Sequence, residues 1–202
     1  MYRQLHETKK IQLRNYRNFE EYSIDFGCET TIFIGKNGMG KTNLLTPISQ
    51  SLSFIFAKKT GEIQYEFIAS SDEKVKSFES TDARYCYKEE KGDYNYPLMI
   101  KVNATEDNND IEWEFYKEND TSGLEDTKYK NANEQFWGYH IVDGKINELP
   151  VFVYFYDSYP HVTAKIDRTK IQKKMNSGNP IPRNTAYYKW NDERNCTDLW
   201  IQ

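Results

Sequence analysis

The sequence predicts an α/β fold with an antiparallel β-subdomain, and three observations carry that prediction. Residues 30–34 form a β-branched, almost wholly apolar run, which is typical of a strand covered on both faces. A glycine-rich loop follows at 35–42, and apolar residues then recur at helical spacing up to residue 56. Stretches with β-type patterning at 11–26 and 97–116 add two antiparallel hairpins.

The first hairpin shows strict alternation on both sides of a polar turn at 15–18. Apolar residues occupy every second position, at Ile11, Leu13, Tyr22, Ile24 and Phe26. We therefore expect one face of this hairpin to be buried and the other to face solvent.

The helix after the loop is predicted from an apolar stripe, which consists of Leu44, Leu45, Ile48, Leu52, Ile55 and Phe56. This stripe should pack against a sheet. Pro47 removes one backbone hydrogen bond, so we expect it to kink the helix or to loosen its first turns.

The rest of the chain is predicted more coarsely. Residues 97–102 and 111–116 are β-rich and flank an acidic tip at 106–110, while 59–95 mix charged residues with Tyr and Phe and could hold strands. The pattern predicts a polar loop or a marginal helix at 118–134 and a second buried strand at 151–156. A weakly amphipathic basic segment follows at 164–175.

We expect a single lobe in three parts. Residues 1–57 hold the first hairpin, the loop strand and the helix; 58–150 form a β-rich insertion; and 151–202 supply a core strand and a basic helical segment. Residues 199–202 look like the first turn of a helix without its stop signal, so we expect the lobe to be incomplete at its C-terminus.

Composition narrows the class of protein. Among 202 residues, 15% aromatic content argues against a disordered chain, and 27 Lys and Arg against 31 Asp and Glu give a net charge of −4. A protein that holds nucleic acid by bulk charge is normally basic, so only a local patch could do so here. Cys28, Cys86 and Cys196 lack metal-ligand or disulfide spacing, and no apolar run is long enough to span a membrane, which together predict reduced thiols in a cytoplasmic protein.

The loop at 35–42 carries the chemistry. Gly35, Gly40, Lys41 and Thr42 fill every fixed position of the phosphate-binding pattern G-x-x-x-x-G-K-[ST]. The glycines let the backbone wrap a phosphate group with its N–H groups, and the start of the following helix adds its dipole. Lys41 would reach the β- and γ-phosphates as a catalytic point charge, and the Thr42 hydroxyl would take a Mg²⁺ coordination position. A glycine-rich turn without a ligand is the alternative.

With their neighbours, these residues resemble the RecF/SMC/OLD-like branch of ABC-type ATPases. The resemblance rests on residues 11–19, on 24–26, and on the G-x-N-G-x-G-K-T form of the loop with Asn37 at its third position. Bacterial anti-phage ATPases, such as the ATPase subunit of Septu and its retron relatives, look most similar. Residues 187–193 also resemble a segment that these proteins carry shortly before their second half.

The resemblance implies the N-terminal lobe of a P-loop NTPase head that binds ATP and Mg²⁺. A signature loop from a second head would close over the γ-phosphate, so a homodimer or higher oligomer of heads is expected. The turn at 14–18 would lie near the adenine and ribose, with Arg17 as a candidate contact to the base or a phosphate; a solvated turn is the alternative. The candidate nucleotide contacts are Gly35, Lys36, Asn37, Gly38, Met39, Gly40, Lys41, Thr42, Asn43 and Arg17.

The implied role is in bacterial DNA surveillance or anti-phage defence, where such an ATPase gates a nuclease effector. A nucleic acid is a further expected partner, and a membrane is not. The dense basic stretch, formed by Lys165, Arg168, Lys170, Lys173, Lys174 and Arg183, is either a patch for such a partner or the solvated face of a helix.

Elements that hydrolysis requires are missing from the sequence. We find no LSGG-type signature and no apolar strand ending in Asp-Glu. Asp157 follows the apolar run at 151–156 and is either a second metal ligand beside Thr42 or a turn residue, but Ser158 stands where the glutamate base is expected. Two other functions therefore stay open: a non-catalytic ATPase fragment that binds a partner, and a small-molecule P-loop kinase that uses Asp157.

Overall fold

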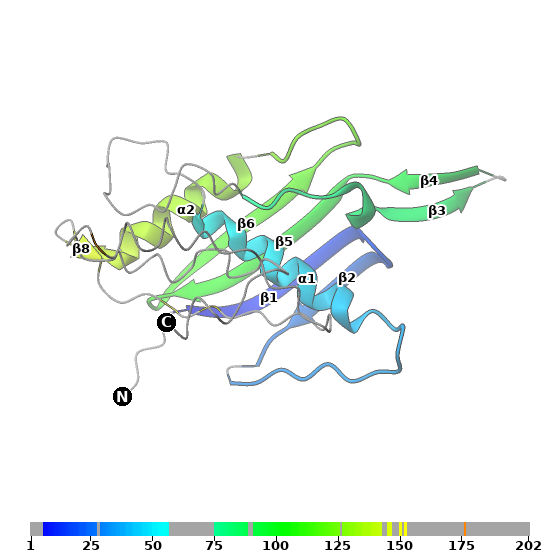
Figure 1. Cartoon of the computed structure of the whole chain (residues 1–202). Helices are drawn as coiled ribbons and strands as arrows, with labels where there is room; N and C mark the ends of the chain where they lie inside the picture. Colours follow the sequence, from blue (N-terminus) through cyan, green and yellow to red (C-terminus); the bar gives the residue numbers. More distant parts are fainter. Residues whose placement is uncertain are drawn as a thin grey trace. The chain divides into compact units, whose positions relative to one another are not determined.

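The computed structural model describes residues 6–27, 29–56, 75–88, 91–125, 127–142, 145–146, 150, 152 and 176. The chain divides into two compact units, the first comprising Met1–Lys59 and Lys74–Pro150 and the second Thr60–Glu73 and Val151–Gln202. The helices and strands of Figure 1 that are named below all belong to the first unit.

A four-stranded antiparallel sheet forms the base of the first unit. Its strands are β1 (His6–Tyr16), β2 (Phe19–Asp25), β5 (Leu98–Glu106) and β6 (Asn109–Lys117), in the order β2-β1-β5-β6. The pairing places Ile11 opposite Ile24 on one side and opposite Val102 on the other. Both predicted hairpins are therefore present, and β1 and β5 join them into one sheet.

Burial alternates along β1, β5 and β6 as the sequence predicts. Along β2 the prediction is wrong, because only Ile24 is buried and Tyr22 is 43% exposed. Every second residue of β5 is buried, and Leu98, Ile100 and Val102 are completely inaccessible. The β5–β6 turn passes through Asp107 and Asn108, whose φ angles of 47° and 65° suit a two-residue hairpin turn. Asn tolerates this left-handed conformation better than most residues do, so the polar tip makes the tight turn.

Helical segments cover one face of the sheet (Figure 1). They are α1 (Lys41–Ser51), the 3₁₀ segment η1 (Leu52–Phe56) and α2 (Thr127–His140). Trp113 of β6 is buried beneath them and contacts the Phe54 ring at a centroid distance of 4.7 Å, with the two rings tilted by 48°. Its Nε1 donates to the carbonyl of Ser51 at 2.9 Å. The core thus lies between the sheet and this helical layer.

The helix after the loop differs from its prediction at the C-terminal end. α1 stops at Ser51 and continues as η1, so that Leu52 and Ile55 are buried from a 3₁₀ turn rather than from one long helix. Pro47 lies buried inside α1, and Leu45, predicted to face the sheet, is 41% exposed. The buried face of α1 is partly polar and includes Ser49 and Gln50.

The predicted strand at 30–34 is absent: the segment is irregular, and none of the described residues pairs with it in a ladder. Ile32 is 74% and Ile34 93% exposed. Only Phe33 turns inward, meeting Phe26 edge-on at 6.5 Å. A strand that is buried on both faces needs other elements packed against each face. The described part of the chain does not cover this segment in that way.

The remaining described elements are short. The 3₁₀ turn η2 (Ser80–Asp82) is followed by the hairpin of β3 (Arg84–Lys88) and β4 (Lys91–Asn95). α2 is followed by β7 (Ile141–Val142) and β8 (Lys145–Ile146). The sequence predicts a polar loop or a marginal helix at 118–134. The described residues 118–125 contain no helix, and α2 begins at Thr127. The strand predicted at 151–156 and the basic segment at 164–175 fall outside the described residues, apart from Phe152.

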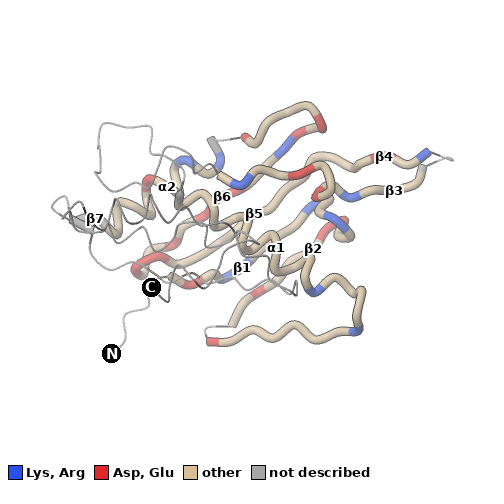
Figure 2. The backbone as a smooth tube through the Cα atoms, in the orientation of Figure 1, with Lys and Arg blue, Asp and Glu red and all other residues tan. Residues whose placement is uncertain are grey.

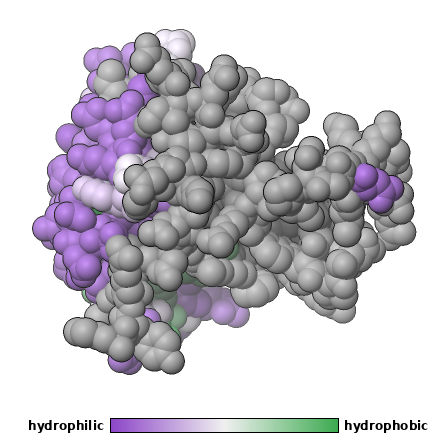
Figure 3. Space-filling view, turned by 90° about the vertical axis from the view of Figure 1, so that its left-hand side faces the viewer, coloured by the Kyte–Doolittle hydropathy of each residue, from purple (hydrophilic) through white to green (hydrophobic). Residues whose placement is uncertain are grey.

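Among the described residues, no helix is long and apolar enough to cross a membrane. The described surface visible in Figure 3 is mainly hydrophilic.

Candidate functional site

The glycine-rich loop runs directly into the N-terminus of α1, as the motif requires. Gly38 has a φ of 81° and Gly40 a φ of 89°, and both values lie in the left-handed region that residues with a side chain rarely adopt. A Cβ added at Gly40 would also lie 2.7 Å from Nδ2 of Asn18, so a larger residue would have to displace the Asn18 side chain in addition to adopting a left-handed backbone. The loop conformation thus depends on glycine at positions 38 and 40.

Lys41 is the first residue of α1, and its side chain folds back over the loop. Its Nζ donates to the carbonyl oxygens of Gly35 at 2.8 Å and of Lys36 at 3.0 Å. Gly40 caps α1 without any side-chain hydrogen bond, and the first turn contains no acidic residue. An ammonium group and a helix start without a side-chain cap therefore meet at the loop, an arrangement that favours an anion.

Thr42, Asn37 and Met39 are exposed around this loop. Mg²⁺ in phosphate sites is held by one or two protein oxygens and completed by substrate phosphates and water. The Thr42 hydroxyl suits that donor set, and the described residues contain no cluster of three or more His, Cys, Asp or Glu side chains that could hold a metal alone. Asp157 lies outside the described residues, and its role as a metal ligand stays a prediction.

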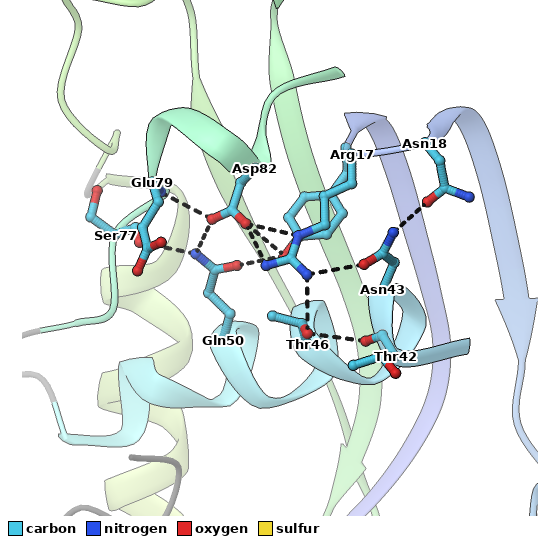
Figure 4. Close-up of polar contacts among 10 residues, drawn as sticks. Arg17, Asn18, Thr42, Asn43, Thr46, Gln50, Ser77, Glu79 and Asp82 are labelled. Carbon is cyan, nitrogen blue, oxygen red and sulfur yellow. Dashed lines mark hydrogen bonds and ion pairs between the residues drawn. The ribbon is translucent and has the colours of Figure 1, made fainter. Parts of the chain in front are cut away.

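Arg17 lies beside the first two turns of α1 rather than alone in solvent (Figure 4). Its Nη1 donates to Oδ1 of Asn43 at 3.1 Å and to Oγ1 of Thr46 at 3.4 Å, and its Nε and Nη2 donate to Oδ1 of Asp82 at 3.0 and 2.9 Å. Burial lowers the pKa of Arg17, but Tyr16 and Asp82 outweigh it and raise the pKa above its ordinary value. The guanidinium is therefore a permanent cation anchored next to the loop helix.

The turn between β1 and β2 also contacts the loop helix directly. Nδ2 of Asn43 donates to Oδ1 of Asn18 at 2.9 Å. Within α1, the Thr46 hydroxyl, which accepts from Arg17, donates to the carbonyl of Thr42 at 3.0 Å. The structure thus brings Arg17, Asn43 and Thr42 into one neighbourhood, although the turn and the loop are distant in sequence.

Sequence reasoning missed Asp82, which holds Arg17. Asp82 lies in a polar stretch with no motif around it. The one signal in the sequence was Gln50, a polar residue near the end of an apolar helical stripe, which is 1% exposed and approaches the Asp82 carboxylate at 3.3 Å.

Charges on the described strands are mixed rather than gathered by sign (Figure 2). Lysines and arginines on the solvent face of the sheet lie next to carboxylates, as Lys10 does to Asp25, Arg14 to Glu21 and Lys101 to Glu112. The basic residues at 165–183 are not among the described ones, so their role in a nucleic-acid patch stays a prediction.

Comparisons with known proteins identify the family. The AAA domain family AAA_23 matches residues 10–193. The DNA replication and repair protein RecF is 52% identical over 40 residues in Exiguobacterium sp., 48% over 42 residues in Lactococcus lactis subsp. lactis and 51% over 39 residues in Flavobacterium johnsoniae. These matches cover 19–21% of this chain and 11–12% of each RecF protein, so the aligned stretch spans about a ninth of those relatives.

One solved structure, from work on ATP-driven dimerization and DNA-stimulated activation of SMC ATPases, is 16% identical with a TM-score of 0.42 and covers 90% of this chain and 97% of that chain. The family match confirms the predicted fold class, the P-loop lobe with its antiparallel sheet, and the RecF similarity agrees with the predicted branch. Because the family model covers most of its length, the chain belongs to the AAA domain family.

Proposed function

We propose that this chain is the ATP- and Mg²⁺-binding lobe of a RecF/SMC-like ABC-type ATPase. The observation that carries the proposal is the placement of Lys41. Its ammonium group lies over a loop with two left-handed glycines, at the N-terminus of α1, which has no side-chain cap. Backbone amides, a helix dipole and a mobile cation are the combination that binds a polyphosphate.

Each candidate residue has a role in this proposal. The backbone from Gly35 to Gly40 cradles the phosphates, with Lys36, Asn37 and Met39 as its exposed positions, and Lys41 exchanges its two carbonyl partners for phosphate oxygens. Thr42 holds Mg²⁺, which when bound neutralises phosphate charge. Asn43 contributes its backbone, since its side chain is hydrogen-bonded to Arg17 and Asn18.

Arg17 reaches the nucleotide in this proposal only by giving up a present partner. Its guanidinium already serves Asp82, Asn43 and Thr46, and the residue is partly buried. A phosphate could replace the 3.4 Å contact with Thr46, the longest of the set.

The test is binding of a fluorescent ATP analogue in the presence of Mg²⁺. Lys41→Ala should weaken binding about 10- to 100-fold, the range expected for losing a charge-assisted contact. Lys91→Ala, which removes an exposed lysine from β4, is the matched control and should bind like the wild type. Equal binding by wild type and Lys41→Ala would refute the proposal.

Hydrolysis, assembly and biological role are further proposals that rest on the family resemblance. We expect two heads to form a dimer in which each head completes the nucleotide site of the other. We also expect DNA to act as a ligand. In the cytoplasm of a bacterium under phage attack, ATP binding or hydrolysis would control a nuclease effector. ATP turnover by this chain alone would instead favour a self-sufficient enzyme and a role for Asp157. Capture of no nuclease with the tagged protein from its native host, together with no nuclease domain in the full reading frame, would contradict the effector proposal.

A further inference from the structure

A buried carboxylate outside the phosphate-binding motif ties three elements together. Asp82, the last residue of η2, is 3% exposed. Its Oδ1 accepts from Nε and Nη2 of Arg17, and its Oδ2 accepts from the backbone N–H of Glu79 at 3.0 Å and from Nε2 of Gln50 at 3.3 Å. The Tyr16 hydroxyl also lies 3.3 Å from Oδ1. We call Tyr16, Arg17, Gln50, Glu79 and Asp82 the Asp82 cluster, and the last four of these residues are labelled in Figure 4.

The cluster has more bonds than a surface ion pair. The backbone N–H of Arg17 donates to the carbonyl of Asp82 at 2.7 Å, so main chain and side chains join the same two residues. Gln50 bridges onward, accepting from the Tyr16 hydroxyl at 3.1 Å and donating to the carbonyl of Ser77 at 2.9 Å. A buried carboxylate this fully partnered is rigid, and removing its charge leaves the Arg17 cation without its main counter-ion.

From the Asp82 cluster, two chains of contacts lead to the phosphate-binding loop. In the first, Nη1 of Arg17 reaches the Thr46 hydroxyl, which donates to the carbonyl of Thr42. In the second, Nη1 reaches Asn43, which donates to Asn18, the residue that lies against Gly40. The side chains of Asn43 and Thr46 in α1 are therefore oriented from Arg17, and Arg17 is oriented by Asp82.

We propose that Asp82 is a positioning residue for the phosphate-binding loop. Held by Tyr16 and Gln50, its carboxylate fixes the Arg17 guanidinium, and that guanidinium fixes the turn of α1 that carries Thr42 and Asn43. Asp82 itself touches no nucleotide. This inference rests on the proposed nucleotide binding at the loop, and it adds that a residue of the insertion at 58–150 sets the affinity of that site.

The first experiment compares Asp82→Asn with the wild type in binding the fluorescent ATP analogue with Mg²⁺, well below the melting temperature of both proteins. Asn keeps the shape of the side chain and removes the charge. We expect binding to be about tenfold weaker, because the turn of α1 that carries Thr42 would no longer be held in place. Asp110→Asn, an exposed carboxylate in the β5–β6 hairpin whose Oδ1 accepts from the Thr105 hydroxyl, is the matched control and should bind like the wild type.

A purely structural carboxylate would give a different result. Asp82→Asn would then lower the melting temperature while the folded fraction bound the analogue with unchanged affinity, and this outcome would overturn the inference. If the wild type itself fails to bind the analogue, the proposed function fails first, and that result is separate from any effect of Asp82.

A second measurement needs no variant. Binding at the loop should reciprocally tighten the Asp82 cluster, because coupling between two sites acts in both directions. Amide hydrogen exchange of the wild type should therefore slow at Arg17 and Asp82 when the ATP analogue and Mg²⁺ are added. Slower exchange confined to the loop and α1, with Arg17 and Asp82 unchanged, would overturn the inference even if Asp82→Asn did not fold.

Discussion

The β5–β6 hairpin and the segment at 30–34 are both rich in apolar residues, but only one of them is covered. Ile100 of β5 is completely buried and Trp113 of β6 is 1% exposed, because α1, η1 and α2 lie over that face of the sheet. Ile32 and Ile34 are 74% and 93% exposed just before the phosphate-binding loop. Apolar residues thus determine which segment can be buried, and burial itself requires an element that covers it.

The largest expected effect comes from the covered region. Trp113→Ala should lower the free energy of unfolding by about 3–5 kcal/mol, because it removes a buried indole, its contact with Phe54 and its hydrogen bond to Ser51. Urea unfolding followed by circular dichroism measures this loss.

Ile34→Ala is the counterpart in the uncovered region. We expect a change within about 0.5 kcal/mol, as for most exposed positions. A loss of more than about 1 kcal/mol would break the comparison, since it would mean that the segment is covered in solution.

The covered region was also the one that the sequence predicted well. When one face of a strand is buried, apolar and polar residues alternate, so a strand such as β5 can be predicted from its own residues. The polar tip at 106–110 predicted the turn. The strand at 30–34 could not be judged in this way, because a continuous apolar run says that both faces can be buried and does not say by what. The end of α1 at Ser51 was equally hidden, since the apolar stripe runs on into η1.

The candidate site also contains one part that the sequence predicted and one part that it did not. The loop at 35–42 is local in sequence, so the spacing of its glycines, Lys41 and Thr42 is enough to select them. The Asp82 cluster is assembled from residues far apart in the chain, with Arg17 and Asp82 joined across 65 positions. Such a contact leaves no spacing pattern in one sequence, and only tertiary structure brings it together.

The next effect sharpens the contrast within the loop itself. Gly40→Ala should cost about 2 kcal/mol of unfolding free energy, because the left-handed backbone costs a residue with a Cβ about 1–2 kcal/mol and the new methyl group meets Asn18. Gly38→Ala has a similar φ but no heavy atom within 4 Å of the added Cβ, so about 1 kcal/mol is expected. Thermal unfolding of the two variants side by side makes the measurement, and equal losses would show that Asn18 does not pack against the loop.

A small effect is expected on the solvent face of β6, where Glu112 precedes Trp113 in the strand and lies on the opposite face. Nζ of Lys101 lies 2.6 Å from Oε1 of Glu112, and this hydrogen bond, helped by Asn103 and opposed by burial, lowers the pKa of Glu112. Because the folded pKa lies below the unfolded one, the pair stabilises the fold above the unfolded value, and the contribution disappears as the pH falls through the folded value. Glu112 is 52% exposed, so only about 0.2–1 kcal/mol is expected.

Glu112→Gln isolates this contribution when unfolding is measured at pH 7 and at pH 3. The wild type should lose about 0.5 kcal/mol more than Glu112→Gln over that range at low salt, and the gap should narrow in 1 M NaCl, where exposed charges are screened. Glu118→Gln, an exposed glutamate just past the end of β6, serves as control and should follow the wild type. Identical acid profiles for wild type and Glu112→Gln would mean that the open face of the sheet contributes no measurable electrostatic stability, and that the stability of β6 comes from its buried face alone.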